Sequence, residues 1–553
     1  MQTIMQTIKQ FRSVAIFSHL FNIVSLIIVS VVFAFVQMFC NNKTMAILQQ
    51  NHYYIFPTLK WVFSFKTKNK NELSFFIILD CVIVCVIIAL FKIWELTFIF
   101  YYIPIVMSLV YLVLLYNVVS SQKLKKPLVE TFRIKRLNVT FIILFSALGC
   151  FVLLLSYVLN PIMLILFIAL NLLSPVILCC ASLINYPYEK VIQMSFIIKA
   201  KQKLKTYKHL IVVAITGSYG KTSTKNFLKT MLSKKFSVLC SPNSFNTPMG
   251  VTKTILEHLK PHHQILILEM GADHKNDIKK LCKIVSPDVC VVTSVGEQHL
   301  KTFKTFENII KTKYQIVEFS KPNAMFVTNL TNDVCKNYFA RSPLKNYGVN
   351  FVGSNAFCVA NKPECFVEGT AFWGFIDGKK FNIKTKLLGS FNTINIMLAM
   401  VVAYNLGVDV EELEHAAITL KPVEHRLELK QVNNNLFIID DSFNSNPLGA
   451  KVAVETLKQF AYRKIIITCG MVELGQSQFS ENYNFGKLLC GLDEVIVVNN
   501  VNFEAISSGV INAGGVKPKL FNSFSEAYKY AINNITEKTI ILIENDLTDS
   551  YIM

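Results

Sequence analysis

The sequence predicts an α-helical membrane region followed by two α/β domains, and three observations support this. Hydrophobic residues make up 52% of the 553 residues and the mean hydropathy is +0.42, which is unusual for a chain that is soluble throughout. Residues 1–209 carry 20 Lys and Arg against 5 Asp and Glu, so most of the net charge of +20 lies there. After residue 209, short β-branched runs alternate with helical patterns, which is typical of a parallel sheet covered by helices. We divide the chain into a membrane region (1–185), an amphipathic linker (186–208) and two α/β domains (209–421 and 422–553).

Five stretches of the first region are long and apolar enough to cross a bilayer, which takes about 20 residues. The loops at 41–73 and 120–137 are rich in Lys and Arg, and the positive-inside rule places both in the cytoplasm. We therefore expect a multi-pass protein of the inner (cytoplasmic) membrane with both α/β domains in the cytoplasm. The five expected spans are residues 13–40, 74–91, 97–119, 138–158 and 161–184.

Two further features of this region concern lipid. Residues 190–209 mix apolar residues and Lys at helical spacing, so they form either a helix along the inner leaflet or an ordinary solvated linker helix. Asp80 lies inside the second expected span, where it is either functional or neutralised by a proton or a neighbouring helix. The location of the positive charge favours anionic membrane lipids, and no nucleic acid, as the partner.

The cysteines indicate a reducing compartment. The chain has 14 of them, several inside apolar runs, and no C-x-x-C pair occurs in the sequence. Disulfides and structural zinc are therefore not expected.

A phosphate-binding loop opens the first α/β domain. Residues 214–223 read AITGSYGKTS between an expected strand and an expected helix, which is a Walker A motif with Ala in place of the first Gly. The backbone N–H groups of such a loop hold phosphate oxygens, while the lysine reaches the β and γ phosphates and the following hydroxyl binds Mg²⁺. ATP and Mg²⁺ are therefore the expected cofactors. The loop residues expected to bind them are Gly217, Ser218, Gly220, Lys221, Thr222 and Ser223.

Other polar residues follow neighbouring strands, where open α/β sheets bind their ligands. Glu269 ends the run QILILE, His299 follows DVCVVTSV, and Asp440 and Asp441 end LFIIDD. A carboxylate and an imidazole at the same sheet edge as Thr222 would suit Mg²⁺. Taken singly, each residue is more often a capping or hydrogen-bonding group, and only the ordered set favours a metal site.

Nine motifs occur in a fixed order between residues 209 and 550. They are ITGSYGKTSTK (215–225), NSFNTPMGV (243–251), LEMGADH (268–274), TSVGEQHL (293–300), IIKTKYQIVE (309–318), GSFNTINIMLA (389–399), EHRLE (424–428), DDSFNSNP (440–447) and GMVELG (470–475). This set resembles the Mur ligase family, the ATP-dependent amide ligases of cell-wall (peptidoglycan) precursor synthesis. The resemblance implies a P-loop central domain and a Rossmann-like C-terminal domain.

The resemblance also implies a two-step reaction. ATP would phosphorylate a substrate carboxylate, and an amine would then displace phosphate from the acyl phosphate. The branch of the family most similar to this chain joins D-alanyl-D-alanine to a UDP-N-acetylmuramoyl-tripeptide. The implied partners are a small-molecule or lipid-linked wall precursor and an amino acid or dipeptide.

The residue roles implied by the resemblance fall into two groups. Lys221, Lys313, His299 and Arg426 would be catalytic, and Thr222, Glu269, His299 and Lys313 would form the metal sites. Lys313 falls where the family carries a carbamylated lysine, although a solvated helix lysine would fit the sequence alone. Asn395 would contact adenine, Arg426 the γ phosphate and Asp441 the ribose, so catalysis would require closure of the C-terminal domain.

Three features depart from the family pattern. The five expected spans stand in place of the domain that holds the UDP-sugar, the chain ends in ENDLTDSYIM instead of a Gly-Ser-Arg-rich segment, and Phe443 replaces a Tyr. Nucleotide chemistry therefore transfers better than the identity of acid and amine. Two alternatives remain, namely a ligase acting on a lipid-linked or membrane-proximal substrate and a non-catalytic nucleotide-binding membrane scaffold.

Overall fold

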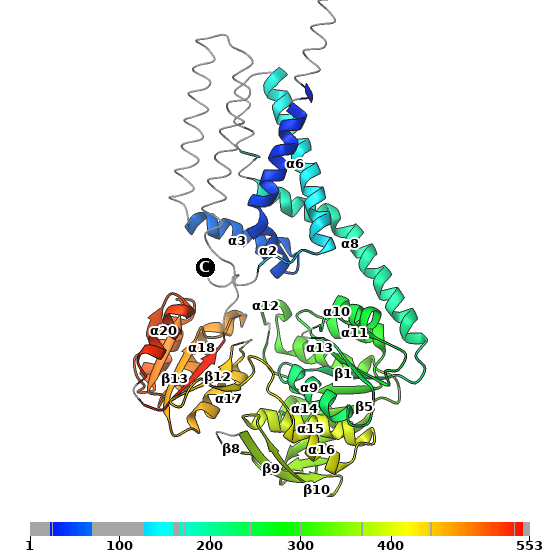
Figure 1. Ribbon diagram of the computed structural model, residues 1–553, viewed down its shortest axis with the longest axis vertical. Coiled ribbons are helices and arrows are strands. Elements are labelled where there is room, and N and C mark those ends of the chain that lie inside the picture. Colours follow the sequence, from blue (N-terminus) through cyan, green and yellow to red (C-terminus); the bar gives the residue numbers. More distant parts are fainter. Residues whose placement is uncertain are drawn as a thin grey trace, which may run out of the picture. The chain divides into compact units, whose positions relative to one another are not determined.

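The computed structural model divides the chain into two units, one up to Ile192 together with residues 548–553, and one from Gln193 to Leu547. We describe each by itself (Figure 1). The described residues are 23–24, 26–68, 127–158, 166, 169–170, 173–242, 245–298, 300–366, 369–442, 445–472, 474–535 and 537–545.

The described part of the first unit is helical. It contains α2 (Asn42–Gln50), α3 (Ile55–Lys68), α6 (Phe132–Val158) and the first part of α8 (Ser174–Lys205), together with a helix over Leu26–Cys40. Its buried core includes Phe33, Met45, Phe141 and Phe145.

Within the described residues, one helix segment, Phe132–Leu155 of α6, is long and apolar enough to cross a membrane. A second candidate exists only if Leu26–Cys40 and Asn42–Gln50, which are bent by 52° at their junction, count as one span. The expected span 138–158 coincides with α6, and the spans 74–91 and 97–119, with Asp80, lie outside the described residues. The spans 13–40 and 161–184 are described only in part.

Helix α8 runs without interruption through the expected boundary at residues 185 and 186 and contains Pro187. Two contacts to α6 flank this proline. Arg136 donates to Glu189 from Nε at 2.6 Å and from Nη2 at 2.9 Å, and Thr140 donates to Asn185 Oδ1 at 2.8 Å. A bidentate guanidinium–carboxylate pair is strong and geometrically specific, so it holds α8 on one side of Pro187, while the Thr140–Asn185 hydrogen bond holds it on the other.

The second unit begins with a ten-stranded sheet in the order β10-β9-β7-β6-β5-β4-β1-β3-β2, with β8 paired to β9. Strands β1 to β7 pair in parallel, and β8 to β10 join in antiparallel fashion. The strands are β1 (Ile211–Thr216), β2 (Val238–Cys240), β3 (Ile265–Glu269), β4 (Val289–Val292), β5 (Met325–Asn329), β6 (Lys345–Phe351), β7 (Cys358–Ala360), β8 (Glu364–Phe366), β9 (Gly369–Ile376) and β10 (Lys379–Thr385).

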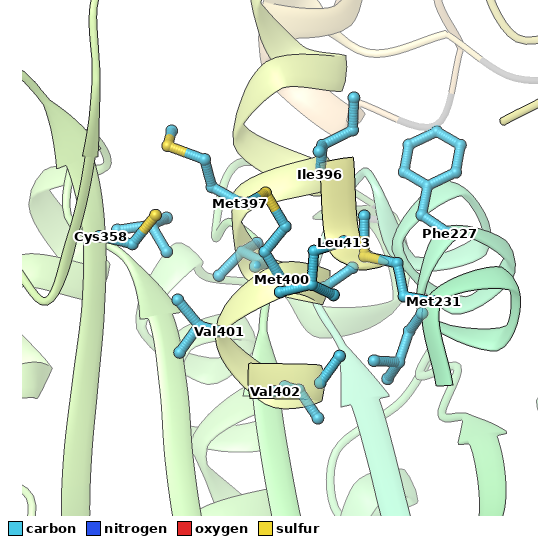
Figure 2. Packing of buried hydrophobic residues seen from close by; sticks show 14 of the residues in the cluster. Phe227, Met231, Cys358, Ile396, Met397, Met400, Val401, Val402 and Leu413 are labelled. Carbon is cyan, nitrogen blue, oxygen red and sulfur yellow. The ribbon is translucent and has the colours of Figure 1, made fainter. Parts of the chain in front are cut away.

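Alternate residues of each strand point to opposite faces of this sheet, and both sets are hydrophobic and buried. Helices therefore cover both faces. One face is packed by α9 (Lys221–Leu232), α15 (Ser390–Asn405) and α16 (Val410–Ile418). Figure 2 shows Ile396 of α15 and Leu413 of α16 toward Phe227 and Met231 of α9, and Met397 and Val401 of α15 toward Cys358 of β7. The other face is packed by α10 (Pro248–Lys253), α11 (Asp277–Val285), α13 (Phe306–Glu318) and α14 (Asp333–Phe339), with the short α12 (Leu300–Phe303) beside them.

The C-terminal part holds a six-stranded sheet in the order β11-β12-β16-β13-β14-β15, parallel except for β11. This mostly parallel sheet with helices agrees with the expected Rossmann-like domain. Its strands are β11 (Glu428–Gln431), β12 (Leu436–Asp441), β13 (Arg463–Thr468), β14 (Glu494–Val498), β15 (Lys519–Phe521) and β16 (Thr539–Glu544). Its helices are α17 (Pro447–Lys458), α18 (Gln478–Leu488), α19 (Phe503–Asn512) and α20 (Phe524–Asn533).

Candidate active site

The phosphate-binding loop connects β1 to α9 and depends on two glycines. Gly217 has a φ of +147° and Gly220, the N-cap of α9, has a φ of +80°. A Cβ atom would lie 2.1 Å from Thr293 Oγ1 at Gly217 and 2.4 Å from Asn395 Oδ1 at Gly220. The loop therefore needs glycine both for its backbone angles and for its close approach to neighbouring side chains.

Replacement of Gly220 by Ala should destabilise the protein by about 2–5 kcal/mol, because a left-handed conformation costs about 1–2 kcal/mol and overpacking about 1–3 kcal/mol. Gly378 is a matched control, since its φ is +76° but nothing lies within 4 Å of its added Cβ. Gly378→Ala should cost only about 1–2 kcal/mol. Urea unfolding of both variants tests this, and equal losses would show that the contact with Asn395 does not matter.

The side chain of Lys221 folds back onto the backbone of the phosphate-binding loop. Its Nζ donates to the carbonyl oxygens of Gly217 at 2.7 Å and of Ser218 at 3.3 Å. Burial lowers the pKa of Lys221, and the nearby Glu269 opposes this shift. The ammonium group therefore lies at the loop that would surround the phosphates.

Glu269 and Thr222 meet at the carboxyl edge of the sheet, as the sequence predicted. Thr222 Oγ1 donates to Glu269 Oε2 at 2.9 Å, and Asn246 Nδ2 donates to Glu269 Oε1 at 3.1 Å. The Lys225 Nζ lies 3.8 Å from Glu269 Oε2 and donates to the Ser241 carbonyl oxygen at 3.0 Å. This buried carboxylate is thus held by a hydroxyl, an amide and a cation.

The donor set fits Mg²⁺. No group of three or more His, Cys, Asp or Glu side chains arranged for a metal occurs among the residues that the structure describes, and His299 lies outside them. Mg²⁺, however, usually takes one or two carboxylates with phosphate oxygens and water, so Thr222 and Glu269 suffice from the protein side.

Lys313 lies on α13 and is only 2% exposed, whereas Lys311, two residues earlier, is exposed. Burial lowers the pKa of Lys313 to about 7, and the positive charge of Lys221 adds to this effect. A solvated helix lysine therefore does not describe this residue. Its amine is substantially uncharged at neutral pH, which is the form that reacts with CO₂.

These side chains surround one cavity of about 150 Å³. Arg426, which precedes β11, also lines it, and burial lowers the pKa of its guanidinium while Asp441 and Glu269 oppose this. The polar residues that converge there include Ser218, Lys221, Thr222, Glu269, Lys313 and Arg426.

Two other expected nucleotide contacts lie close by and are engaged within the protein. Asn395 Oδ1, on α15, accepts a hydrogen bond from Thr224 Oγ1 at 3.2 Å. Asp441 Oδ1 accepts from the backbone N–H of Leu427 at 3.2 Å, and burial raises the pKa of Asp441 to about 6. Asp441 therefore holds the segment around Arg426, and its expected ribose contact stays a prediction.

The sequence reasoning assigned no role to Asn246 or Glu544. Asn246 lies inside the motif at 243–251, two residues before Pro248. Its place in that motif is the sequence feature that could have identified it as a site residue. Glu544 ends β16, is 1% exposed, and accepts hydrogen bonds from Thr468 Oγ1 at 2.5 Å and from Ser445 Oγ. Burial raises the pKa of Glu544 to about 7. Only the central position of β16 in the sheet, which the sequence did not predict, places it there.

Comparisons with known proteins agree with this geometry. Residues 215–403 match the Mur ligase middle domain, and residues 425–544 match the Mur ligase glutamate ligase domain. The chain is 28% identical to the UDP-N-acetylmuramoyl-tripeptide–D-alanyl-D-alanine ligase of Buchnera aphidicola, over 50% of this chain and 61% of that protein. It is also 28% identical to the ligase of the same name from Bacillus subtilis, over 48% of this chain and 57% of that protein.

A solved structure gives the same result. The MurF ligase from Thermotoga maritima, in complex with ADP, matches with a TM-score of 0.59 and 28% identity over 65% of this chain and 81% of that one. The chain spans about three fifths of the length of the two curated relatives above. With both domain models matched in order and their motifs gathered around one cavity, the chain belongs to the Mur ligase family.

Proposed function

We propose that this protein is an ATP-dependent amide ligase that forms ADP and phosphate. The observation that carries the proposal is the convergence of Lys221, Thr222, Glu269, Lys313 and Arg426 on one cavity. A non-catalytic nucleotide switch would need the phosphate-binding loop but not a buried, substantially uncharged lysine beside it. The scaffold alternative therefore explains less of the site.

In the proposed reaction, an oxygen of the substrate carboxylate attacks the γ phosphorus of ATP and the bond to ADP breaks. The amine then attacks the acyl carbon, loses a proton, and phosphate leaves. The chain's own contribution is to place two cations, Lys221 and Arg426, where negative charge builds up on the transferred phosphoryl group.

Thr222 and Glu269 would hold Mg²⁺, which would neutralise phosphate charge. Lys313, as a carbamate formed from its neutral amine and CO₂ with release of a proton, would turn a cation into an anion that supports a second metal ion. His299 would complete the metal site.

For the substrates, we propose that the acid is UDP-N-acetylmuramoyl-tripeptide and that the amine is D-alanyl-D-alanine. The names of the similar ligases support this choice. A lipid-linked precursor is the second candidate, and the observation that favours it is the basic, apolar region before the ligase domains.

We also propose that the protein is anchored in the inner membrane with its ligase domains in the cytoplasm. The support is the apolar segment Phe132–Leu155 and the excess of Lys and Arg in residues 1–209. Retention of the full chain in membranes washed with alkaline carbonate is expected, and release by that wash would contradict anchoring.

The purified full-length protein should form ADP from ATP and Mg²⁺ only when both an acid and an amine are present. A matrix of UDP-linked tripeptide, its lipid-linked form, D-alanyl-D-alanine and single amino acids would identify the pair, with product mass as the readout. ADP formation that is independent of every acid and amine would leave a simple ATPase in place of a ligase.

A further inference from the structure

A second cavity of about 560 Å³ lies beside the first, and its use is unexplained by the proposed reaction. Thr222 and Arg426 line both cavities, so the two meet where the γ phosphate of ATP would lie. The second cavity has the volume of a ligand pocket rather than of a packing defect. Its lining includes Thr222, Lys225, Lys229, Ser241, His425 and Arg426.

One wall of this cavity is a face of α9. Thr222, Lys225 and Lys229 recur at spacings of three and four residues, which places them on the same side of the helix. The ammonium group of Lys225 is held by the Ser241 carbonyl oxygen at 3.0 Å and lies 3.8 Å from Glu269. Lys229, one turn further along, is exposed and lines the same cavity.

The segment 422–426, which connects the two ligase domains, also lines the cavity. His425 has a φ of +62°, and its Nδ1 lies 2.9 Å from Asp440 Oδ2, which also accepts from Lys430 at 2.8 Å. Asp440 is thus already in contact with both Lys430 and His425. A left-handed non-glycine residue costs about 1–3 kcal/mol, and such residues are concentrated at functional sites.

The charge of the cavity is positive. Among the described residues that line it, Lys225, Lys229 and Arg426 are cations and Glu424 is the one carboxylate. Cations supplied to one cavity by two separate segments favour an anion with several oxygen atoms, and both Arg and Lys bind phosphate.

We propose that the second cavity binds a phosphate group at a position distinct from the phosphates of ATP. This inference rests on the proposed ligase function, which supplies two sources of such a group. One is orthophosphate, released next to Thr222 and Arg426 when the amide bond forms. The other is a phosphate of the acid substrate, whose carboxylate must reach the same point.

Equilibrium binding of radiolabelled orthophosphate to the full-length protein tests the proposal, with a saturating non-hydrolysable ATP analogue and Mg²⁺ present to fill the first cavity and the γ-phosphate position. Binding should persist in the presence of the ATP analogue, and Lys229→Ala should weaken it about tenfold, the loss expected for one charge-assisted hydrogen bond. Lys234→Ala is the matched control, because Lys234 is also exposed, lies just after α9 and does not line the cavity. It should leave phosphate affinity unchanged.

Orthophosphate binding is measured without catalytic turnover, so its outcome is independent of the outcome of the ligase assay. Displacement of orthophosphate by the ATP analogue, equal affinity of Lys229→Ala and the unaltered protein, or no binding at millimolar phosphate would each overturn the proposal. Competition by UDP-linked tripeptide would identify the acid substrate as the source of the group. Persistence of orthophosphate binding in its presence would identify the released product.

Discussion

Replacement of Lys221 by Ala should reduce ATP cleavage by about 10³-fold, the loss typical of removing one group that stabilises charge in a transition state. The Lys221 ammonium lies against the Gly217 and Ser218 carbonyl oxygens at the start of α9 and lines the first cavity. Steady-state ADP formation measures the effect. Because Lys221 also contacts the loop backbone, circular dichroism must show that the fold is intact.

The control for this experiment is Lys234→Ala, an exposed lysine just beyond the same helix. It should retain full activity. A folded Lys221→Ala variant that still forms ADP at the original rate would remove the assignment of the phosphate-binding loop.

Replacement of Lys313 by Ala should also cost about 10³-fold in ligase activity, because it removes a charged group beside the reacting phosphate. Lys311→Ala should be as active as the unaltered protein, since Lys311 is exposed on α13 whereas Lys313 is buried. Bicarbonate or short carboxylates should partly restore Lys313→Ala by supplying the missing anion. If Lys311→Ala is the inactive variant, the assignment is shifted by two residues.

The same lysine predicts a pH dependence. Its pKa is lowered to about 7, so the amine is protonated and unreactive toward CO₂ below that pH and becomes neutral as the pH rises through about 7. Carbamate formation, followed by the ¹³C signal of labelled bicarbonate, should therefore increase from pH 6 to pH 8 in the unaltered protein. Lys313→Ala should give no such signal at any pH.

Local sequence predicted the parts of the site that depend on short-range patterns. The Walker A spacing identified Gly217 to Ser223, and the end of an apolar run identified Glu269, because both follow from strand–loop–helix geometry. The resemblance placed Lys313 in the site, although periodicity alone could not choose between Lys311 and Lys313.

Features that depend on contacts between distant parts of the chain could not be predicted from the sequence. The position of β16 between β12 and β13 is set by pairing across about 70 residues or more of chain, and it alone brings Glu544 beside Ser445 and Thr468. The continuity of α8 through Pro187 depends on Arg136 and Thr140, which are about 45 to 53 residues away. Neither contact has a local signal.

The backbone on either side of Arg426 has a consequence for how the site opens. His425 and Leu427 both have positive φ values, of +62° and +46°, and the Leu427 N–H is held by Asp441 alone among the described contacts. Strand β11 begins only at Glu428, so the segment can rotate without breaking a sheet hydrogen bond. Relaxation of two strained residues would offset much of the loss of that single bond. Arg426 therefore lies between two strained residues, whose relaxation would offset part of the cost of moving its charge out of both cavities. That cost includes the contacts of Leu427 and His425 and the hydrogen bond from the Arg426 N–H to the Val423 carbonyl oxygen.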